Sequence, residues 1–145
     1  MNKTILLTGG AGVVGQALLE QITDHTVICL TRRQPVSGPN VISIPGDIAQ
    51  PNFGLSVALF HSLAQRVDAI VHSAAITDFT RPIDELRRAN VDGVRHMLHF
   101  AKVANVPLLL EMPPPPALFA VDPRRVFGLL IEPTQLELHR RARQA

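Results

Sequence analysis

The fold is decided by a stretch near the start of the chain, Thr8-Gly9-Gly10-Ala11-Gly12-Val13-Val14-Gly15, which follows the apolar run Ile5-Leu6-Leu7. It spells both G-x-G-x-x-G, from Gly10, and T-G-x-x-G-x-x-G, from Thr8. Such a turn needs glycine because the chain bends sharply, the backbone approaches a pyrophosphate, and the next helix packs close to the sheet. Free N–H groups at the helix start would hold the anion. The stretch predicts a dinucleotide site formed by Gly9, Gly10, Ala11, Gly12, Val13, Val14 and Gly15.

Strands alternate with helices along the first three quarters of the chain. Short apolar runs predict strands at residues 3–8, 26–31, 41–44 and 67–73, with a fifth from residue 107. Apolar residues three and four apart predict helices at residues 11–23, 55–65 and 83–105. This alternation gives βαβ units and right-handed crossovers. The predicted class is therefore α/β, a Rossmann-type doubly wound parallel sheet that is incomplete, with about five strands.

Two of these helices carry specific expectations about their inward faces. In the helix at 83–105, Asn90 falls on the inward stripe, and a buried amide needs hydrogen-bond partners. A bridge between helix and sheet is favoured over contact with a ligand. In the helix at 55–65, the spacing places inward Leu55, Ala58, Leu59, Ser62 and Leu63.

The composition changes after Glu111. Met112 is followed by the run Pro113-Pro114-Pro115-Pro116, and proline cannot continue a central strand because it lacks a backbone N–H. We expect an NAD(P)-binding domain over residues 1–111 and an irregular Pro-rich divergent tail over 112–145. Polyproline segments enter aromatic-lined grooves, so a protein partner at the tail stays open.

The totals exclude several classes of function. The chain has 145 residues, a net charge of +2, and a single cysteine, Cys29. No basic run is interleaved with aromatic residues, so we expect no nucleic-acid partner. No apolar run approaches a membrane span and the N-terminus does not resemble a signal peptide, so we expect no membrane association. A lone cysteine cannot form an intramolecular disulfide, which favours a cytoplasmic location.

The end of the second predicted strand indicates which dinucleotide is bound. Sites that prefer NAD place a carboxylate there, about 20 residues past the glycine turn. This chain has Thr31-Arg32-Arg33 instead. A guanidinium can grip a 2′-phosphate through two parallel hydrogen bonds. The prediction is NADP rather than NAD, held by Arg32, which is nearer the strand end; the alternative is a pair of exposed loop arginines.

Two other strand ends supply candidate cofactor contacts. After the third strand, Asp47 could accept a hydrogen bond from the adenine amino group while Ile48 covers the ring, or Asp47 could cap a turn. After the fourth strand, the small residues Ser73, Ala74 and Ala75 leave room for a ribose and a nicotinamide.

Three histidines are candidates for acid–base chemistry or metal binding. His72 ends the fourth strand and is expected to be buried and hydrogen-bonded rather than an acid or base. His96 and His99 stand three apart on a helix and could form a metal pair, but no third ligand is evident, so no metal site is predicted.

Several motifs together resemble the extended short-chain dehydrogenase/reductases: the glycine turn, Gly46-Asp47-Ile48, Gly54-Leu55-Ser56, His72-Ser73-Ala74-Ala75 and Ala89-Asn90-Val91-Asp92-Gly93. The run from Val71 through Phe79 to Asn90 is most similar to the thioester-reductase branch, related to the reductase domains of carboxylic acid reductases. The resemblance covers residues 1–110. It implies NADP(H) binding and hydride transfer to a thioester, aldehyde or other carbonyl on a small-molecule or carrier-bound substrate. It also implies that the glycines, Arg32, Asp47, Ile48, Ser73, Ala74 and Ala75 line the cofactor site.

The sequence departs from that family where catalysis belongs. The family places a Ser or Thr at the end of the fifth strand and a Tyr-x-x-x-Lys on the next helix, whose Tyr exchanges a proton with the carbonyl oxygen. This chain has no Tyr, and its lysines are Lys3 and Lys102. No catalytic residue is predicted, and whether the chain is an enzyme stays open. The hypotheses are a reductase half with a truncated or frameshifted C-terminus, a non-catalytic NADP(H)-sensing or partner-binding module, and a non-functional fragment.

Overall fold

The computed structural model describes residues 2–110. Contacts divide the chain into two units, Met1–Pro113 and Pro114–Ala145, and the described residues all belong to the first. The proposed polyproline segment and tail lie outside the described residues. Within the first unit the strands are β1 (Thr4–Thr8), β2 (Thr26–Thr31), β3 (Val41–Pro45), β4 (Ala69–His72) and β5 (Leu108–Leu110). The helices are α1 (Val13–Gln21), α2 (Val57–Arg66), α3 (Ile83–Arg87) and α4 (Gly93–Ala104), with short turns η1 (Pro51–Gly54) and η2 (Arg88–Asp92).

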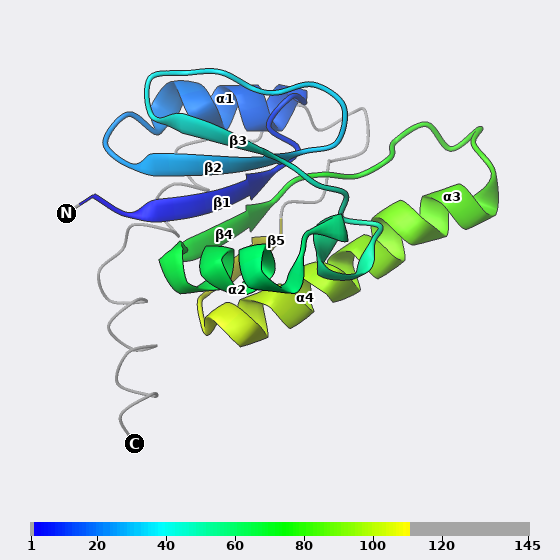
Figure 1. The fold of residues 1–145 in the computed structure, drawn as a ribbon. Helices are drawn as coiled ribbons and strands as arrows, with labels where there is room; N and C mark the ends of the chain where they lie inside the picture. Colours follow the sequence, from blue (N-terminus) through cyan, green and yellow to red (C-terminus); the bar gives the residue numbers. More distant parts are fainter. Residues whose placement is uncertain (1, 111–145) are drawn as a thin grey trace. The chain divides into compact units, whose positions relative to one another are not determined.

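The strands form one parallel sheet in the order β3-β2-β1-β4-β5 (Figure 1). The chain runs outward from β1 through β2 to β3, then returns to place β4 on the other side of β1. The connection between β2 and β3, residues 32–40, contains no helix in the described structure. The order of strands therefore reverses between β1 and β4, which is where doubly wound sheets bind their ligands. The predicted α/β Rossmann-type class is confirmed.

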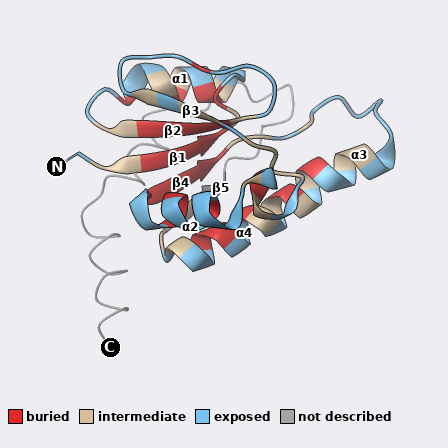
Figure 2. Ribbon diagram, viewed as in Figure 1, coloured by how far each residue is buried: buried red, intermediate tan, exposed pale blue. Residues whose placement is uncertain are grey.

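Helices cover both faces of the sheet (Figure 1). α1 lies on one face, while α2 and α4 lie side by side on the other. β1, β2 and β4 are buried along most of their length, whereas β3 at the edge of the sheet is only partly buried, and the loop that leads into α3 is exposed (Figure 2). Burial of both sheet faces explains why β1, β2 and β4 read as continuous apolar runs instead of alternating ones.

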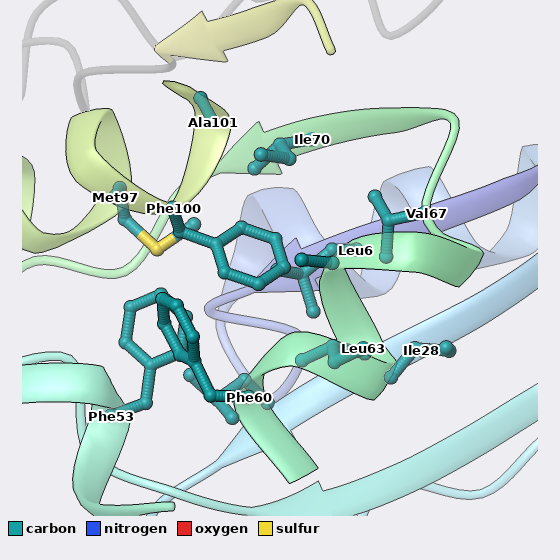
Figure 3. Close-up of a cluster of buried hydrophobic side chains, with 12 residues drawn as sticks. Leu6, Ile28, Phe53, Phe60, Leu63, Val67, Ile70, Met97, Phe100 and Ala101 are labelled. Atoms are coloured by element: carbon teal, nitrogen blue, oxygen red, sulfur yellow. The ribbon is translucent and has the colours of Figure 1, made fainter. Parts of the chain in front are cut away.

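Three phenylalanines form the centre of the core beneath α2 and α4 (Figure 3). The rings of Phe53 and Phe100 lie 5.4 Å apart, and those of Phe60 and Phe100 lie 5.2 Å apart in an edge-to-face arrangement. Such aromatic pairs add stabilisation beyond the apolar area they bury. They pack on the sheet through the side chains of Leu6, Ile28 and Ile70.

The predicted inward face of the helix at 55–65 was largely wrong. The helix begins at Val57, because the Ser56 hydroxyl accepts a hydrogen bond from the Leu59 backbone N–H at 3.2 Å and caps it. Leu59 is 43% exposed, and Ala58 and Ser62 are also exposed, whereas the buried residues are Phe60, Leu63 and Ala64. The bulky Phe60 ring sets the buried face, because it fills the space between Phe53 and Phe100.

The segment from residue 83 to 104 is one continuous helical run with a wider turn inside it. The turn η2 has π-helical hydrogen bonding, which inserts an extra residue between α3 and α4. The buried residues of this run are Ala89, Gly93, Met97, Phe100 and Ala101, and Asn90 is half-buried beside them. Asn105 ends α4 in a left-handed conformation with φ of 56°.

No helix within residues 2–110 has the length and apolar character that crossing a bilayer demands.

Candidate functional site

The glycine turn, residues 8–15, leaves no space for side chains at two of its positions. Gly9 has φ of +75°, and a Cβ there would lie 2.8 Å from the backbone nitrogen of Ala74. A Cβ on Gly15 would lie 2.0 Å from the carbonyl oxygen of Gly9. The Gly12 N–H donates to that same oxygen at 3.0 Å and closes the turn. Glycine at 9 and 15 is therefore a steric requirement, as the motif predicts.

The start of α1 is open to a ligand. Its N-cap is Gly12, and within the described residues no side chain caps its first turn, which contains no acidic residue. Val13 is 80% exposed. The Gln16 side chain donates to the Gly10 carbonyl at 2.7 Å, which fixes the turn without covering the first amides. An uncapped helix start behind a glycine turn fits the pyrophosphate of a dinucleotide.

The end of β4 is fastened to the end of β1 by the Thr8 hydroxyl. The backbone N–H groups of Ser73 and Ala74 both donate to Thr8 Oγ1 at 3.2 Å. Thr8 Oγ1 also lies 2.6 Å from His72 Nδ1, and both side chains are buried. Burial lowers the pKa of His72 to about 4. His72 is thus buried and hydrogen-bonded, as expected, and Ala75 continues the segment beside the glycine turn.

Sequence reasoning missed the role of Thr8. It was used only as the first letter of a motif, yet its side chain joins two strands whose ends are 64 residues apart in sequence. The signal that could have found it is a hydroxyl at the end of a fully buried strand, since a buried hydroxyl must find partners.

An open cleft of about 480 Å³ lies beside the glycine turn. Ala11 lines it together with Arg32 and Arg33, the two arginines that follow β2. Both arginines are exposed, and neither forms an ion pair with any of the described residues. The structure therefore brings the predicted phosphate-binding residues next to the glycine turn. The remaining lining residues are Gln34, Ile76, Thr77, Asp78 and Arg81.

The loop after β4 also lines this cleft, which the sequence did not indicate. Asp78 and Arg81 face each other there, with Arg81 Nε 3.9 Å from Asp78 Oδ2, and Arg81 also pairs with Glu85. A hydrogen bond from the Thr80 hydroxyl holds the pKa of Asp78 below its usual value, with the Arg81 charge acting in the same direction. Among the described residues the cleft is thus lined by two unpaired arginines, Arg32 and Arg33, and by the ionised Asp78 carboxylate, which is paired with Arg81.

Asn90 holds this loop in place. Its Oδ1 accepts from the Ile76 backbone N–H at 2.8 Å, and its Nδ2 donates to the Ile76 carbonyl at 2.9 Å. Asn90 lies in the π-helical turn η2. Asn90 therefore forms a structural bridge, as the favoured interpretation predicts, but it joins the helix to the loop after β4 and not to a strand.

The end of β3 has a well-defined structural role. Asp47 Oδ1 accepts from the Ala49 backbone N–H at 2.9 Å, so the carboxylate caps a turn, the second of the two interpretations. Ile48 packs on α4, where a Cβ on Gly93 would lie 2.9 Å from its Cδ1. The Ile48 carbonyl accepts from His96 Nδ1 at 2.6 Å.

The histidine pair is used in packing. His96 is bonded to the Ile48 carbonyl, and the His99 ring stacks on Phe60 with centroids 6.0 Å apart. Across residues 2–110 no cluster of three or more His, Cys, Asp or Glu side chains is arranged to hold a metal ion.

Two family models match the chain. A family of NAD-binding domains described as male sterility protein matches residues 36–110, which is 75 of the 145 residues. A second model, described as kinase/pyrophosphorylase, matches residues 97–145. That second match begins inside α4, and most of it lies outside the described residues.

The chain is similar to larger reductases. It is 35% identical to glycine betaine reductase of Emericella nidulans in an alignment that covers 68% of this chain and 10% of that protein. The crystal structure of the terminal R domain from the myxalamid PKS-NRPS pathway is similar with a TM-score of 0.66 and 32% identity, covering 77% of this chain and 34% of that one. The Bordetella bronchiseptica enzyme WbmG, solved in complex with NAD, is similar with a TM-score of 0.57 and 25% identity, covering 76% of this chain and 37% of that one. The chain therefore spans about a third of those solved structures and a tenth of the curated reductase.

Proposed function

The chain belongs to the male sterility protein family of NAD-binding domains, and on that premise we propose that residues 1–110 are the NADP(H)-binding half of a thioester reductase. It is an NAD(P)-binding domain of the thioester-reductase type. The observation that carries the choice of NADP is the cleft beside the glycine turn, where Arg32 and Arg33 stand without an ion-pair partner among the described residues.

The pyrophosphate is held by backbone amides at the start of α1. Gly9 and Gly15 keep the turn compact, and the N–H groups of Val13 and Val14, in the uncapped first turn of α1, are our candidates for the pyrophosphate contact. No carboxylate follows β2 to repel a second phosphate. Arg32 binds the 2′-phosphate through paired hydrogen bonds, and Arg33 adds positive charge to the same cleft.

The other two strand ends hold the outer parts of the cofactor. We place Ser73, Ala74 and Ala75 under the nicotinamide ribose, which is supported by the packing of Gly9 against the Ser73–Ala74 peptide. Asp47 and Ile48 lie at the adenine end, where the unused oxygen of the Asp47 carboxylate can accept a hydrogen bond while its partner caps the turn. When bound, the nicotinamide supplies the hydride chemistry.

The substrate is a thioester, an aldehyde or another carbonyl, held on a carrier or free. Support comes from the relatives, which include a glycine betaine reductase and a terminal R domain of a PKS-NRPS pathway. Because the chain has no Tyr, the family's Tyr-x-x-x-Lys is absent from it. We assign no catalytic residue to residues 2–110, where the pair of Thr8 and His72 is engaged in holding strands together.

A second candidate is a non-catalytic module that senses NADP(H) or binds a partner, or a fragment without function. The absence of Tyr favours it. We also propose that residues 112–145 form a separate tail and that the protein is cytoplasmic. The first family match ends at residue 110, which supports that boundary.

The test is a titration of the full chain with NADPH and with NADH, followed by nicotinamide fluorescence, and then assays with acyl thioesters and aldehydes. Tighter binding of NADPH than of NADH is expected. Turnover of a carbonyl substrate would place the chain among the enzymes, and binding without turnover would favour the sensing module. Failure to bind either dinucleotide would overturn the proposed function.

A further inference from the structure

A buried histidine lies directly behind the segment that would carry the nicotinamide half of the cofactor. His72 is the last residue of β4, is 4% exposed, and pairs in register with Thr8 of β1 on one side and Leu110 of β5 on the other. Thr8 and His72 are the buried polar side chains among the described residues. The proposed function makes no use of the imidazole itself.

The hydrogen bonds around Thr8 fix the protonation of this imidazole. Backbone N–H groups can only donate, and those of Ser73 and Ala74 both point at Thr8 Oγ1. The Ser73 N–H is shared with the Thr8 carbonyl at 3.3 Å. A hydroxyl has two lone pairs and one proton, so with both lone pairs engaged its proton must go to His72 Nδ1. The ring is then neutral, with its own proton on Nε2.

We propose that neutral His72 is a positioning residue for dinucleotide binding: by accepting the Thr8 hydroxyl proton at Nδ1, it aims both Thr8 lone pairs at the Ser73 and Ala74 amides and so holds the floor of the nicotinamide half-site. This inference rests on the proposed function. The link to the ligand is short, because the Ser73–Ala74 peptide is also the surface on which Gly9 packs. A shift of that peptide would displace the floor of the nicotinamide half-site.

Removing or protonating His72 Nδ1 would disturb the hydrogen bonds that Thr8 accepts from the Ser73 and Ala74 amides. An imidazolium would donate from Nδ1 and occupy a Thr8 lone pair, which leaves one of the two amides without its partner. The flanking strands β1 and β5 carry no titratable side chain in the described structure. Cys29 of β2 is buried, and burial raises its pKa to about 11, so it stays neutral in acid. The other ionisable groups on α1, α2 and α4 are exposed, apart from the half-buried His96: Glu20, His61, Arg66, Arg95, His99 and Lys102.

The test compares ligands that do and do not reach the half-site. The full chain and two variants, His72→Leu and His72→Asn, are titrated with NADP⁺ and with 2′,5′-ADP, which lacks the nicotinamide half. The side-chain oxygen of asparagine can replace Nδ1 as an acceptor, whereas leucine cannot. We expect His72→Leu to raise the Kd for NADP⁺ by about 10-fold or more and the Kd for 2′,5′-ADP by less than about 2-fold. His72→Asn is expected to stay within about 3-fold of the unmodified chain for both ligands.

Two controls keep the outcome interpretable. His61→Leu changes an exposed histidine of α2 and should leave both Kd values unchanged. Nitrogen-15 NMR of the unmodified chain at pH 7 should show His72 neutral and protonated at Nε2, a measurement that does not depend on a variant folding. Equal weakening of both ligands by His72→Leu, or a proton on Nδ1, would overturn the positioning role. If the unmodified chain bound neither ligand, the proposed function would fail, and the positioning role would fall with it.

Discussion

The candidate cofactor site has two parts that are built by different means: the glycine turn with the end of β4, and the cleft lined by Arg32 and Arg33. At the glycine turn and the end of β4, the Thr8 and His72 side chains are buried, the Gly9 backbone packs against the Ser73–Ala74 peptide, and the Thr8 hydroxyl has partners for both lone pairs. At the cleft beside it, Arg32, Arg33 and Asp78 are exposed side chains facing water. Ligand binding at the glycine turn depends on shape and on satisfied hydrogen bonds, whereas ligand binding at the cleft depends on charge. Changes to the first should therefore affect folding and every dinucleotide, whereas changes to the second should affect only the choice between dinucleotides.

The largest effect is expected from Gly15→Ala, which tests whether the turn is as tightly packed as its distances indicate. The new Cβ would lie 2.0 Å from the Gly9 carbonyl oxygen, so the backbone must move. We expect a loss of unfolding free energy above about 3 kcal/mol, measured by urea denaturation. Gly12→Ala is the control, since its Cβ would meet the same oxygen at 3.3 Å and should cost much less. Equal stability of the two variants would contradict this account of the turn.

Acid should destabilise the protein through His72. Its pKa is lowered from 6.5 to about 4 by burial, so between those values the unfolded chain binds a proton that the folded chain does not. Stability from this group is complete above pH 6.5 and is lost as the pH falls toward 4, by on the order of 3 kcal/mol. The measurement is the free energy of unfolding from pH 7.5 to pH 4. His72→Asn should flatten this part of the profile, and an unchanged slope in that variant would assign the acid sensitivity to other groups.

At the cleft, Arg32→Asp should change the affinity for NADPH without a loss of stability. A carboxylate at this position repels a 2′-phosphate and can accept a hydrogen bond from a 2′-hydroxyl. We expect NADPH affinity to fall by about 30-fold or more and NADH affinity by less than about 3-fold, with the difference shrinking at high salt. Arg33→Asp is the matched comparison and should have the smaller effect. Equal losses for NADPH and NADH would remove Arg32 from the phosphate role.

The smallest effect is expected from Asp78→Asn in the loop after β4, which lines the same cleft. Removing this ionised carboxylate from the cleft should tighten NADPH binding by about 2-fold to 3-fold and leave NADH unchanged. Fluorescence titration at low salt is the measurement. A loss of NADPH affinity would instead show that Asp78 acts mainly by holding Arg81 in place.

Much of the fold could be predicted because its signals are local. The strand at residues 26–31 was predicted with the bounds that the structure has, since a continuous apolar run marks a strand buried on both faces. The helix at 55–65 was harder to orient. Its small residues gave several equivalent faces, and the space between Phe53 and Phe100 selected the one that carries Phe60. Contacts of that kind depend on segments that the periodicity of one helix does not describe.

By itself the sequence determined the glycine turn, the order of strands and helices, and the basic end of β2, because each follows from a few neighbouring residues. Only the tertiary structure decided what stands opposite them. Parallel pairing of β1 and β4 put Thr8 beside His72, and the bridge from Asn90 to Ile76 fastened the loop whose Asp78 and Arg81 line the same cleft as Arg32. The physical reason is that register and crossover geometry set contacts between distant segments, and no local pattern encodes which strand end will meet which.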